Sequence, residues 1–371
     1  ISSQMPATMP KWSSRSVWYV VSAIGHPPGA RIGKRLLSKR IPQNSFLDYA
    51  EVRNVGFTGR LPGKFVSRKG IVATHLIIVN PTAGRGAARE VAPRVDRLLK
   101  EHGVSFDRVF TERPWHAAEL ARQAVVSGYK VVVALGGDGT SNEVLNGLME
   151  AREAGEGEAA MGVLCVGTGN DFAYGVGVPL DLEAGCAALA RGRTRPIDVG
   201  HAKGLRYFGN GIGIGFDAVV NVQAARYKRL RGFAVYFVAV MRTLLFYYRA
   251  PLTRIELDDG VVELPTLMVS VMNGRRMGGG FLMTPDASPD DGLFDLCIGA
   301  KMNQLQMLAL VPRFMQGTQI GHPRIRMIRS RRVRVVVKEG TQVVHADGET
   351  LTLEATDLEF EVIPQALRVV C

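Results

Sequence analysis

The chain has 371 residues, of which 46% are hydrophobic and 22% charged, so a folded core is expected and a wholly disordered chain is excluded. Its net charge of +12 would by itself suggest a nucleic-acid partner. Residues 1–73 carry 12 Lys/Arg against two acids, whereas residues 74–371 carry 34 basic and 32 acidic side chains. The body of the protein is therefore almost neutral, and we do not expect it to bind nucleic acid.

The N-terminal segment, residues 1–73, is basic, rich in Ser, Pro and Gly, and has neither a helical nor a strand period. We interpret it as a disordered or misassigned extension; a basic arm attracted to membranes is the alternative. Its short apolar run, residues 17–25, precedes most of the positive charge, unlike a signal peptide. The four scattered cysteines form no CxxC motif, which indicates a reducing, cytoplasmic location and no zinc site.

From His75 onward, apolar strand-like runs alternate with segments of helical periodicity. The strand-like runs cover 75–84, 104–111, 130–137 and 161–173, and the helical segments cover 87–103, 116–128 and 142–155. This alternation predicts an α/β domain over residues 74–194, with a parallel sheet and helices on both faces. Such sheets bind ligands at the carboxyl ends of their strands.

After residue 194 the pattern changes to short strand-like runs separated by turn residues. Only residues 218–248 and 301–316 have a helical character. We predict an antiparallel β domain over residues 195–361 that carries two helical insertions. The apolar run at 232–248 is shorter than the ~20 residues of a membrane-spanning helix, and Arg242 interrupts it, so a buried or interfacial helix is expected.

Three loops follow strands of the predicted parallel sheet: "NPTAGRG" (80–86), "GGDGTSNE" (136–143) and "GTGNDFA" (167–173). Glycines allow the backbone to approach phosphates, and a helix starting near Ser141 would offer free N–H groups. Thr140 and Glu143 have the spacing of a capping box. Asp138 would repel a polyphosphate unless Mg²⁺ lies between them, or unless the carboxylate accepts a proton or a hydrogen bond from a hydroxyl group. The middle loop therefore predicts a Mg²⁺-nucleotide site; for the first loop, a plain strand-to-helix connection remains an equal alternative.

These loops belong to a set of motifs that resembles a known family. "VNPTAGRG", "LGGDGTSNEVLNGL", "VGTGNDFA", "NGIGIGFDA", "MGGGFLMTPDASPDDGLFDL" and "HADGE" occur in the same order in the soluble diacylglycerol kinase and sphingosine kinase family, and match its bacterial lipid kinase branch best. "GGDG" alone also occurs in NAD kinases and phosphofructokinases, but six motifs in order are specific.

The resemblance covers about residues 74–371. It implies an α/β nucleotide domain like that of NAD kinases and phosphofructokinases, a C-terminal antiparallel β-sandwich, and a cleft between them where ATP and lipid meet. It also implies that the last residues, 362–371, return to the first domain.

The resemblance further implies two sets of ligand-binding residues. The family's nucleotide contacts fall on Asn80, Thr111, Gly136, Gly137, Asp138, Gly139, Thr140, Ser141, Asn142, Glu143 and Thr168. A structural Mg²⁺ loop falls on 285–295, with the Asp291 carboxylate and the carbonyls of Ser288 and Leu293 as ligands. Thr111 as a simple helix cap and the Asp-Gly pair as a simple turn remain the alternatives.

The family's proton acceptor matches Glu349 in "HADGE". We expect Glu349 to be the general base, Asp138 to organise Mg²⁺ and phosphate, and Asp347 only to shape the turn. The sphingosine kinase branch assigns the base to the acidic residue of the glycine loop, so Asp138 remains the alternative base.

The resulting hypothesis is an ATP-dependent lipid kinase whose cofactors are Mg²⁺ and ATP and whose first candidate substrate is diacylglycerol, which would give phosphatidic acid. A sphingoid base or another lipid alcohol is the second candidate; NAD kinase activity or a non-catalytic nucleotide or lipid sensor is more distant. Two clusters of basic residues, 226–233 and 324–334, have two interpretations: they form solvent-exposed faces, or they attract the anionic headgroups of lipids. Peripheral membrane contact is expected, and a homodimer is left open.

Overall fold

The computed structural model describes residues 73–224, 227 and 233–371. The basic segment 1–72 and most of the basic cluster 226–233 lie outside the described residues, so their predicted roles stay predictions.

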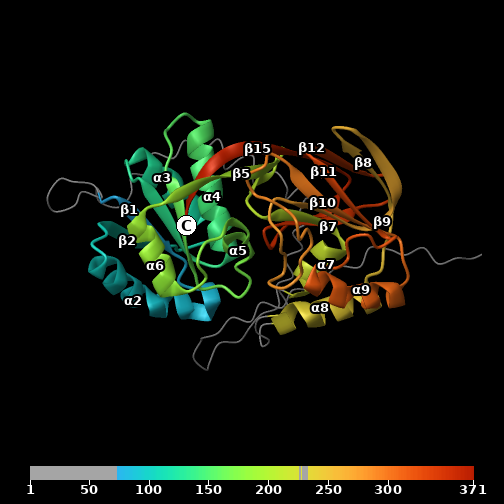
Figure 1. Cartoon of the computed structure of the whole chain (residues 1–371), viewed down its shortest axis with the longest axis horizontal. Coiled ribbons are helices and arrows are strands. Elements are labelled where there is room, and N and C mark those ends of the chain that lie inside the picture. Colours follow the sequence, from blue (N-terminus) through green and yellow to red (C-terminus); the bar gives the residue numbers. More distant parts are fainter. Residues whose placement is uncertain (1–72, 225–226, 228–232) are drawn as a thin grey trace, which may run out of the picture. The chain divides into compact units, whose positions relative to one another are not determined.

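The first half of the described chain alternates strands and helices, as predicted. The strands are β1 (His75–Val79), β2 (Phe106–Phe110), β3 (Val131–Gly136) and β4 (Ala160–Cys165), and the helices are η1 (Ala83–Gly86), α2 (Ala87–Glu101), α3 (His116–Val126), α4 (Asp138–Glu153), α5 (Asp171–Val176) and α6 (Leu182–Arg191). The strands pair in parallel in the order β4-β3-β1-β2. Helices α2 and α6 pack on one face of this sheet and α3 and α4 on the other (Figure 1).

The strand register places the three glycine-containing loops next to one another. Val79 at the end of β1 pairs with Leu135 of β3, which pairs with Leu164 of β4. Because neighbouring parallel strands end at the same edge, the loops that follow them meet there, as the sequence predicted.

The second half is antiparallel. Its strands are β5 (Thr194–Ala202), β6 (Arg206–Phe208), β7 (Gly211–Gly215), β8 (Leu252–Leu257), β9 (Gly260–Met272), β10 (Phe294–Ala300), β11 (Ile325–Ser330), β12 (Arg332–Val337), β13 (Gln342–Ala346), β14 (Glu349–Ala355) and β15 (Asp357–Val370). The predicted class, a parallel-sheet domain followed by an antiparallel β domain, is confirmed.

Strand β15 connects the two sheets. It pairs antiparallel with β12 and β5, and near its end Val369 pairs in parallel with Met161 of β4. The register with β5 shifts between Ile363 and Leu367, and Gln365 in this bulge has a φ of 49°. The end of the chain thus adds a strand to the parallel sheet.

Three helices, α7 (Phe216–Ala224), α8 (Phe233–Phe246) and α9 (Gln304–Gln316), gather on one side of the antiparallel strands (Figure 1). Their inner side chains form an apolar cluster with one face of β9 and β10. The apolar run at 232–248 becomes α8, which has 14 residues. Within the described ranges, every helix is too short or too polar to cross a bilayer.

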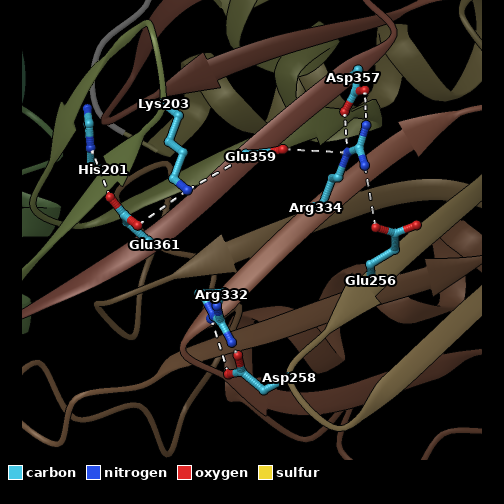
Figure 2. Close-up of polar contacts among 9 residues, drawn as sticks. All are labelled: His201, Lys203, Glu256, Asp258, Arg332, Arg334, Asp357, Glu359 and Glu361. Carbon is cyan, nitrogen blue, oxygen red and sulfur yellow. Dashed lines mark hydrogen bonds and ion pairs between the residues drawn. The ribbon is translucent and has the colours of Figure 1, made fainter.

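Three of the six arginines in the basic cluster 324–334 pair with acids: Arg329, Arg332 and Arg334. Arg334 of β12 contacts Glu256, Asp357 and Glu359 on the neighbouring strands, and Arg332 contacts Asp258 (Figure 2). Exposed pairs of this kind contribute about 0–1 kcal/mol each, so their main effect is to complement charges across the strands. At these two positions the solvated-face interpretation is favoured over headgroup attraction.

Candidate active site

A cavity of about 890 Å³ lies between the glycine loops and the α7–α9 side of the antiparallel sheet. Its polar end is lined by Asn80, Gly137, Asp138, Gly139, Thr140, Thr168 and Glu349, among others. Its other end is lined mainly by apolar side chains, including Phe216, Val220, Val240, Leu244, Met268, Met307, Leu310 and Phe314. The cavity thus runs from a backbone-rich polar mouth into an apolar chamber.

Helix α4 starts at Asp138, with Gly137 as its N-cap and no side-chain cap. The predicted capping box and a start near Ser141 are therefore wrong, because Thr140 already lies within the first turn. Instead, the Thr140 hydroxyl accepts a hydrogen bond from Asn80 Nδ2 at 3.1 Å. The Glu143 carboxylate accepts one from Ala117 N at 3.1 Å and so caps helix α3. Both side chains brace the loop rather than begin its helix.

The glycine loop packs directly against the loop after β4. A Cβ atom on Gly167 would lie 2.6 Å from the Cα of Gly137, closer than non-bonded atoms can approach. Two backbones can meet at this distance only if both residues lack side chains. The first turn of α4, whose backbone N–H groups lack intrahelical acceptors, lines the cavity beside this contact, and such a helix start suits an anion.

Asp138 is half-buried and accepts a hydrogen bond from Phe172 N at 3.2 Å. Burial, together with the nearby carboxylates of Asp171 and Asp347, raises the pKa of Asp138 to about 7. Asp171 is held by Arg276 at 2.8 Å and by Gly279 N at 2.9 Å. In the described part of the chain no basic side chain forms an ion pair with Asp138, so its charge is left for a cation to neutralise.

Glu349 approaches the glycine loop from the opposite wall of the cavity. It begins β14 just after a two-residue turn, in which Asp347 and Gly348 have φ values of 46° and 86°. Its Oε1 would lie 2.9 Å from a Cβ atom on Gly139. Arg206, whose guanidinium stacks 4.4 Å from the ring of Trp115, lies 3.6 Å from Glu349 Oε2. The hairpin therefore brings Glu349 to the start of α4, and its role as the general base stays a prediction.

Asp347 does more than shape that turn. Its buried carboxylate accepts hydrogen bonds from Asn142 Nδ2 and from the backbone N–H groups of Gly209, Asn210 and Gly211, at 2.8–3.0 Å. Helix α4 is thereby tied to β7 and to the hairpin of Glu349. Sequence reasoning missed this role because the donors are separated from Asp347 by more than a hundred residues.

The predicted nucleotide-binding residues divide into two groups. Asn80, Gly137, Asp138, Gly139, Thr140, Glu143 and Thr168 line the cavity. The residues that do not line the cavity are Gly136, Ser141, Asn142 and Thr111. The first three are buried within the fold, and Thr111, which follows β2, donates its backbone N–H to Val79 O at the end of β1. Asp171 also lines the cavity and was missed, although it lies within "VGTGNDFA"; Arg276, which holds Asp171, directly precedes the motif that begins at Met277.

The predicted metal loop carries a concentrated negative charge. Asp291 Oδ1 accepts from Leu293 N at 3.1 Å, and its Oδ2 pairs closely with Arg329. Asp295 Oδ2 is buried without a hydrogen-bond partner in the described structure. Burial raises the pKa of Asp295 to about 6; Arg329 opposes this shift, and Asp291 adds to it.

No group of three His, Cys, Asp or Glu side chains in the described ranges could hold a metal. A mixed set of one carboxylate and backbone carbonyls is nevertheless typical of Mg²⁺, and the unpartnered oxygen of Asp295 fits a nearby cation. Arg329 would compete with that cation for Asp291, so the Mg²⁺ loop stays a prediction.

Comparisons with known proteins agree with this geometry. Residues 74–202 match the model of the diacylglycerol kinase catalytic domain, and residues 210–371 match the model of the YegS C-terminal NAD kinase beta sandwich-like domain. The chain is 30% identical over 275 residues to a diacylglycerol kinase of Bacillus subtilis, covering 74% of this chain and 88% of that protein.

It is also 33% identical over 288 residues to a Pseudomonas aeruginosa protein named "Probable lipid kinase YegS-like", covering 77% of this chain and 86% of the relative. A crystal structure of a diacylglycerol kinase from Bacillus anthracis shares the fold, with a TM-score of 0.62, 20% identity and coverage of 80% and 96%. The chain therefore belongs to the family of bacterial diacylglycerol kinases and YegS-like lipid kinases.

Proposed function

We propose that this protein transfers the γ-phosphoryl group of ATP to a lipid hydroxyl, with diacylglycerol as the first candidate and phosphatidic acid as its product. The observation that carries the proposal is the single cavity that joins a glycine-loop mouth to an apolar chamber. The mouth suits a polyphosphate, and the chamber suits hydrocarbon chains.

The residues of the mouth support a division of roles. The start of α4 would bind phosphate oxygens through backbone N–H groups, and Asp138 would hold Mg²⁺. Bound Mg²⁺ would neutralise charge that develops on the phosphates. Glu349, on the opposite wall, would accept the proton of the lipid hydroxyl as that hydroxyl attacks in line. Asp138 remains the alternative base.

The apolar chamber favours a lipid over NAD. A nicotinamide ribose needs hydrogen-bond partners, but the chamber walls are mostly Val, Leu, Met and Phe side chains from α7, α8, α9 and the sheet. Burying hydrocarbon there is worth about 25 cal/mol per Å², whereas an unpaired ribose hydroxyl would cost free energy. The names of the relatives point to the same class of substrate.

We also propose that helices α8 and α9 touch the membrane that supplies the lipid. Their inner faces line the chamber, while Phe237, Leu245 and Phe246 of α8 and Leu305 and Leu308 of α9 are exposed. Segments 233–250 and 301–326 contain arginines and a lysine but no acidic residue. An apolar surface with positive charge and no negative charge suits an anionic bilayer.

The test is phosphoryl transfer from labelled ATP to diacylglycerol, a sphingoid base or NAD, each offered separately with Mg²⁺. Labelled phosphatidic acid supports the proposal, a labelled sphingoid base moves the substrate to the second candidate, and labelled NADP would replace the lipid assignment altogether. The Asp138→Asn variant, assayed in parallel, controls for contaminating kinases.

A further inference from the structure

A row of four residues crosses the antiparallel sheet on its α7–α9 side. His345 of β13 pairs with Gly213 of β7, Gly213 with Ser270 of β9, and Ser270 with Cys297 of β10. In each strand, the residues directly before and after the member of this row belong to the hydrophobic core on the other face of the sheet. The row is polar at His345 and Ser270, although the sheet around it lines an apolar chamber.

His345 is the unusual member of the row. It is 2% exposed and lines the cavity, yet neither of its ring nitrogens has a hydrogen-bond partner in the described structure. Burial lowers the pKa of His345 to about 4, so at neutral pH the imidazole is uncharged and offers one N–H donor and one lone pair. Buried polar groups without partners are uncommon because each costs free energy, so this side chain is a candidate for contact with a ligand.

The lack of a side chain on Gly213 lets His345 and Asp217 pack closely over its backbone. A Cβ atom on Gly213 would lie 2.3 Å from His345 Nε2 and 2.6 Å from Asp217 Oδ2. Asp217, at the start of α7, already accepts a hydrogen bond from Ser270 Oγ at 2.6 Å. The imidazole and this carboxylate therefore lie close together over Gly213, and both line the cavity; we call this group of residues the polar station: His345, Gly213, Asp217 and Ser270.

The polar station lies at an intermediate depth in the cavity. His345 is two residues before Asp347 on the hairpin of Glu349, about 7 Å along the strand. Two residues further on, Gly215 of β7 pairs with Met268, and the lining is apolar from there on. A lipid with its reactive hydroxyl at Glu349 and its chains in the chamber would place the polar part of its backbone at this station.

We propose that the neutral imidazole of His345 donates a hydrogen bond to an ester carbonyl of a glycerolipid whose free hydroxyl is the phosphoryl acceptor. This inference rests on the proposed function and narrows its substrate to neutral ester lipids. A carbonyl matches a neutral donor, and it would satisfy a nitrogen that the fold leaves without a partner. A cationic amine would instead require the carboxylate of Asp217, both of whose oxygens already accept hydrogen bonds, Oδ2 from Ser270 Oγ and Oδ1 from Ala218 N.

The experiment compares a diacylglycerol with the dialkyl ether glycerol of the same chain length, which keeps the hydroxyl and chains but lacks the carbonyls. We expect the wild-type enzyme to favour the diester in kcat/KM by about tenfold, the size of effect of one buried hydrogen bond. The His345→Leu variant should reduce this ratio to near one. Its melting temperature should equal or exceed that of the wild type, because an unpartnered polar group has been removed.

A second variant and a control keep the result interpretable. His345→Asn retains an N–H donor and should retain part of the ester preference. Met268→Leu changes an apolar wall residue and should leave the ester-to-ether ratio as in the wild type. An unchanged ratio in His345→Leu overturns the inference while the kinase assignment stands. A wild-type preference for a sphingoid base that Asp217→Asn abolishes also overturns it. If neither glycerolipid is phosphorylated by the wild type, the proposed function fails and the inference fails with it.

Discussion

The Nδ2 atom of Asn142 donates a hydrogen bond to Oδ2 of Asp347 at 2.8 Å, and both side chains are buried. Asn142 lies in the first turns of the glycine-loop helix, and Asp347 lies in the turn that carries Glu349. The contact therefore sets the distance between the phosphate end of the cavity and the candidate base, and it underlies the first prediction.

Asp347→Asn should destabilise the fold, because it replaces a carboxylate that accepts four hydrogen bonds with an amide that has one acceptor oxygen. A loss of about 1–3 kcal/mol in the free energy of unfolding is expected, measured by urea denaturation. Combining it with Asn142→Ala should give a non-additive result, since the two residues share a bond. Asp357→Asn, at an exposed pair with Arg334, is the control. An Asp347→Asn variant as stable as the wild type would show that the contact does not hold the two elements together.

Glu349→Gln should lower kcat by about 10²–10⁴-fold with ATP and lipid binding retained, because glutamine has the same shape but cannot accept the proton. Glu354→Gln, an exposed position on the same strand, should keep full activity. Steady-state kinetics together with calorimetric ATP binding separates catalysis from affinity. If Glu349→Gln remains active and Asp138→Asn is dead, the base is Asp138 and the roles are exchanged.

Asp217 should make stability depend on pH. Burial raises its pKa from 3.8 to about 7, so the folded protein holds this proton more tightly than the unfolded chain. The free energy of unfolding should therefore fall as pH rises from about 4 to about 7, because the unfolded chain releases this proton more readily than the folded protein does. Asp217→Asn cannot ionise, and it should gain about 1–3 kcal/mol relative to the wild type across that window.

The groups that face Asp217 are His345, Ser270 and Cys297, and they are the same in both proteins, so their own titrations largely cancel in the difference. Urea unfolding at pH 4, 6 and 8 measures the effect. Parallel stability profiles for the two proteins would mean that Asp217 ionises at its ordinary pKa.

The acidic loop offers a test for Mg²⁺. If Mg²⁺ binds at Asp291, added Mg²⁺ should raise the melting temperature of the wild type but not of Asp291→Ala. Arg329→Gln should bind Mg²⁺ more tightly, because the guanidinium no longer competes for the Asp291 carboxylate. Arg332→Gln, which affects only the separate contact with Asp258, should respond as the wild type does. A wild-type shift that persists in Asp291→Ala would place the metal elsewhere.

Bilayer contact should depend on the exposed side chains of α8 and α9. Phe246 and Leu305 are 71% and 77% exposed, and replacing both with Ser should lower binding to anionic vesicles about tenfold or more. Leu353→Ser, at an exposed apolar site on β14, is the matched control and should bind normally. Co-sedimentation with vesicles measures the partition coefficient. Equal binding by the double variant would exclude this surface as the docking site.

The sequence alone determined the class of the fold and the place of its phosphate loops. Short apolar runs such as 75–79 and 131–135, which end in turn residues, are typical of buried strands, and the helical segments between them favour a parallel sheet. Once the strands are parallel, the glycine loops that end them must share an edge. These are local patterns, and local patterns can be recognised without coordinates.

Only the tertiary structure decided how the side chains around the cavity are used. Thr140 and Glu143 have the spacing of a capping box, yet Asn80 and Ala117 are the partners they find. Asp347 resembled a turn residue, and His345 had no signal beyond its place in "HADGE". Each of these outcomes depends on donors, acceptors or empty space supplied by segments far apart in the chain. A sequence pattern records the spacing along one segment, whereas burial and hydrogen bonding are set by what the fold brings against it.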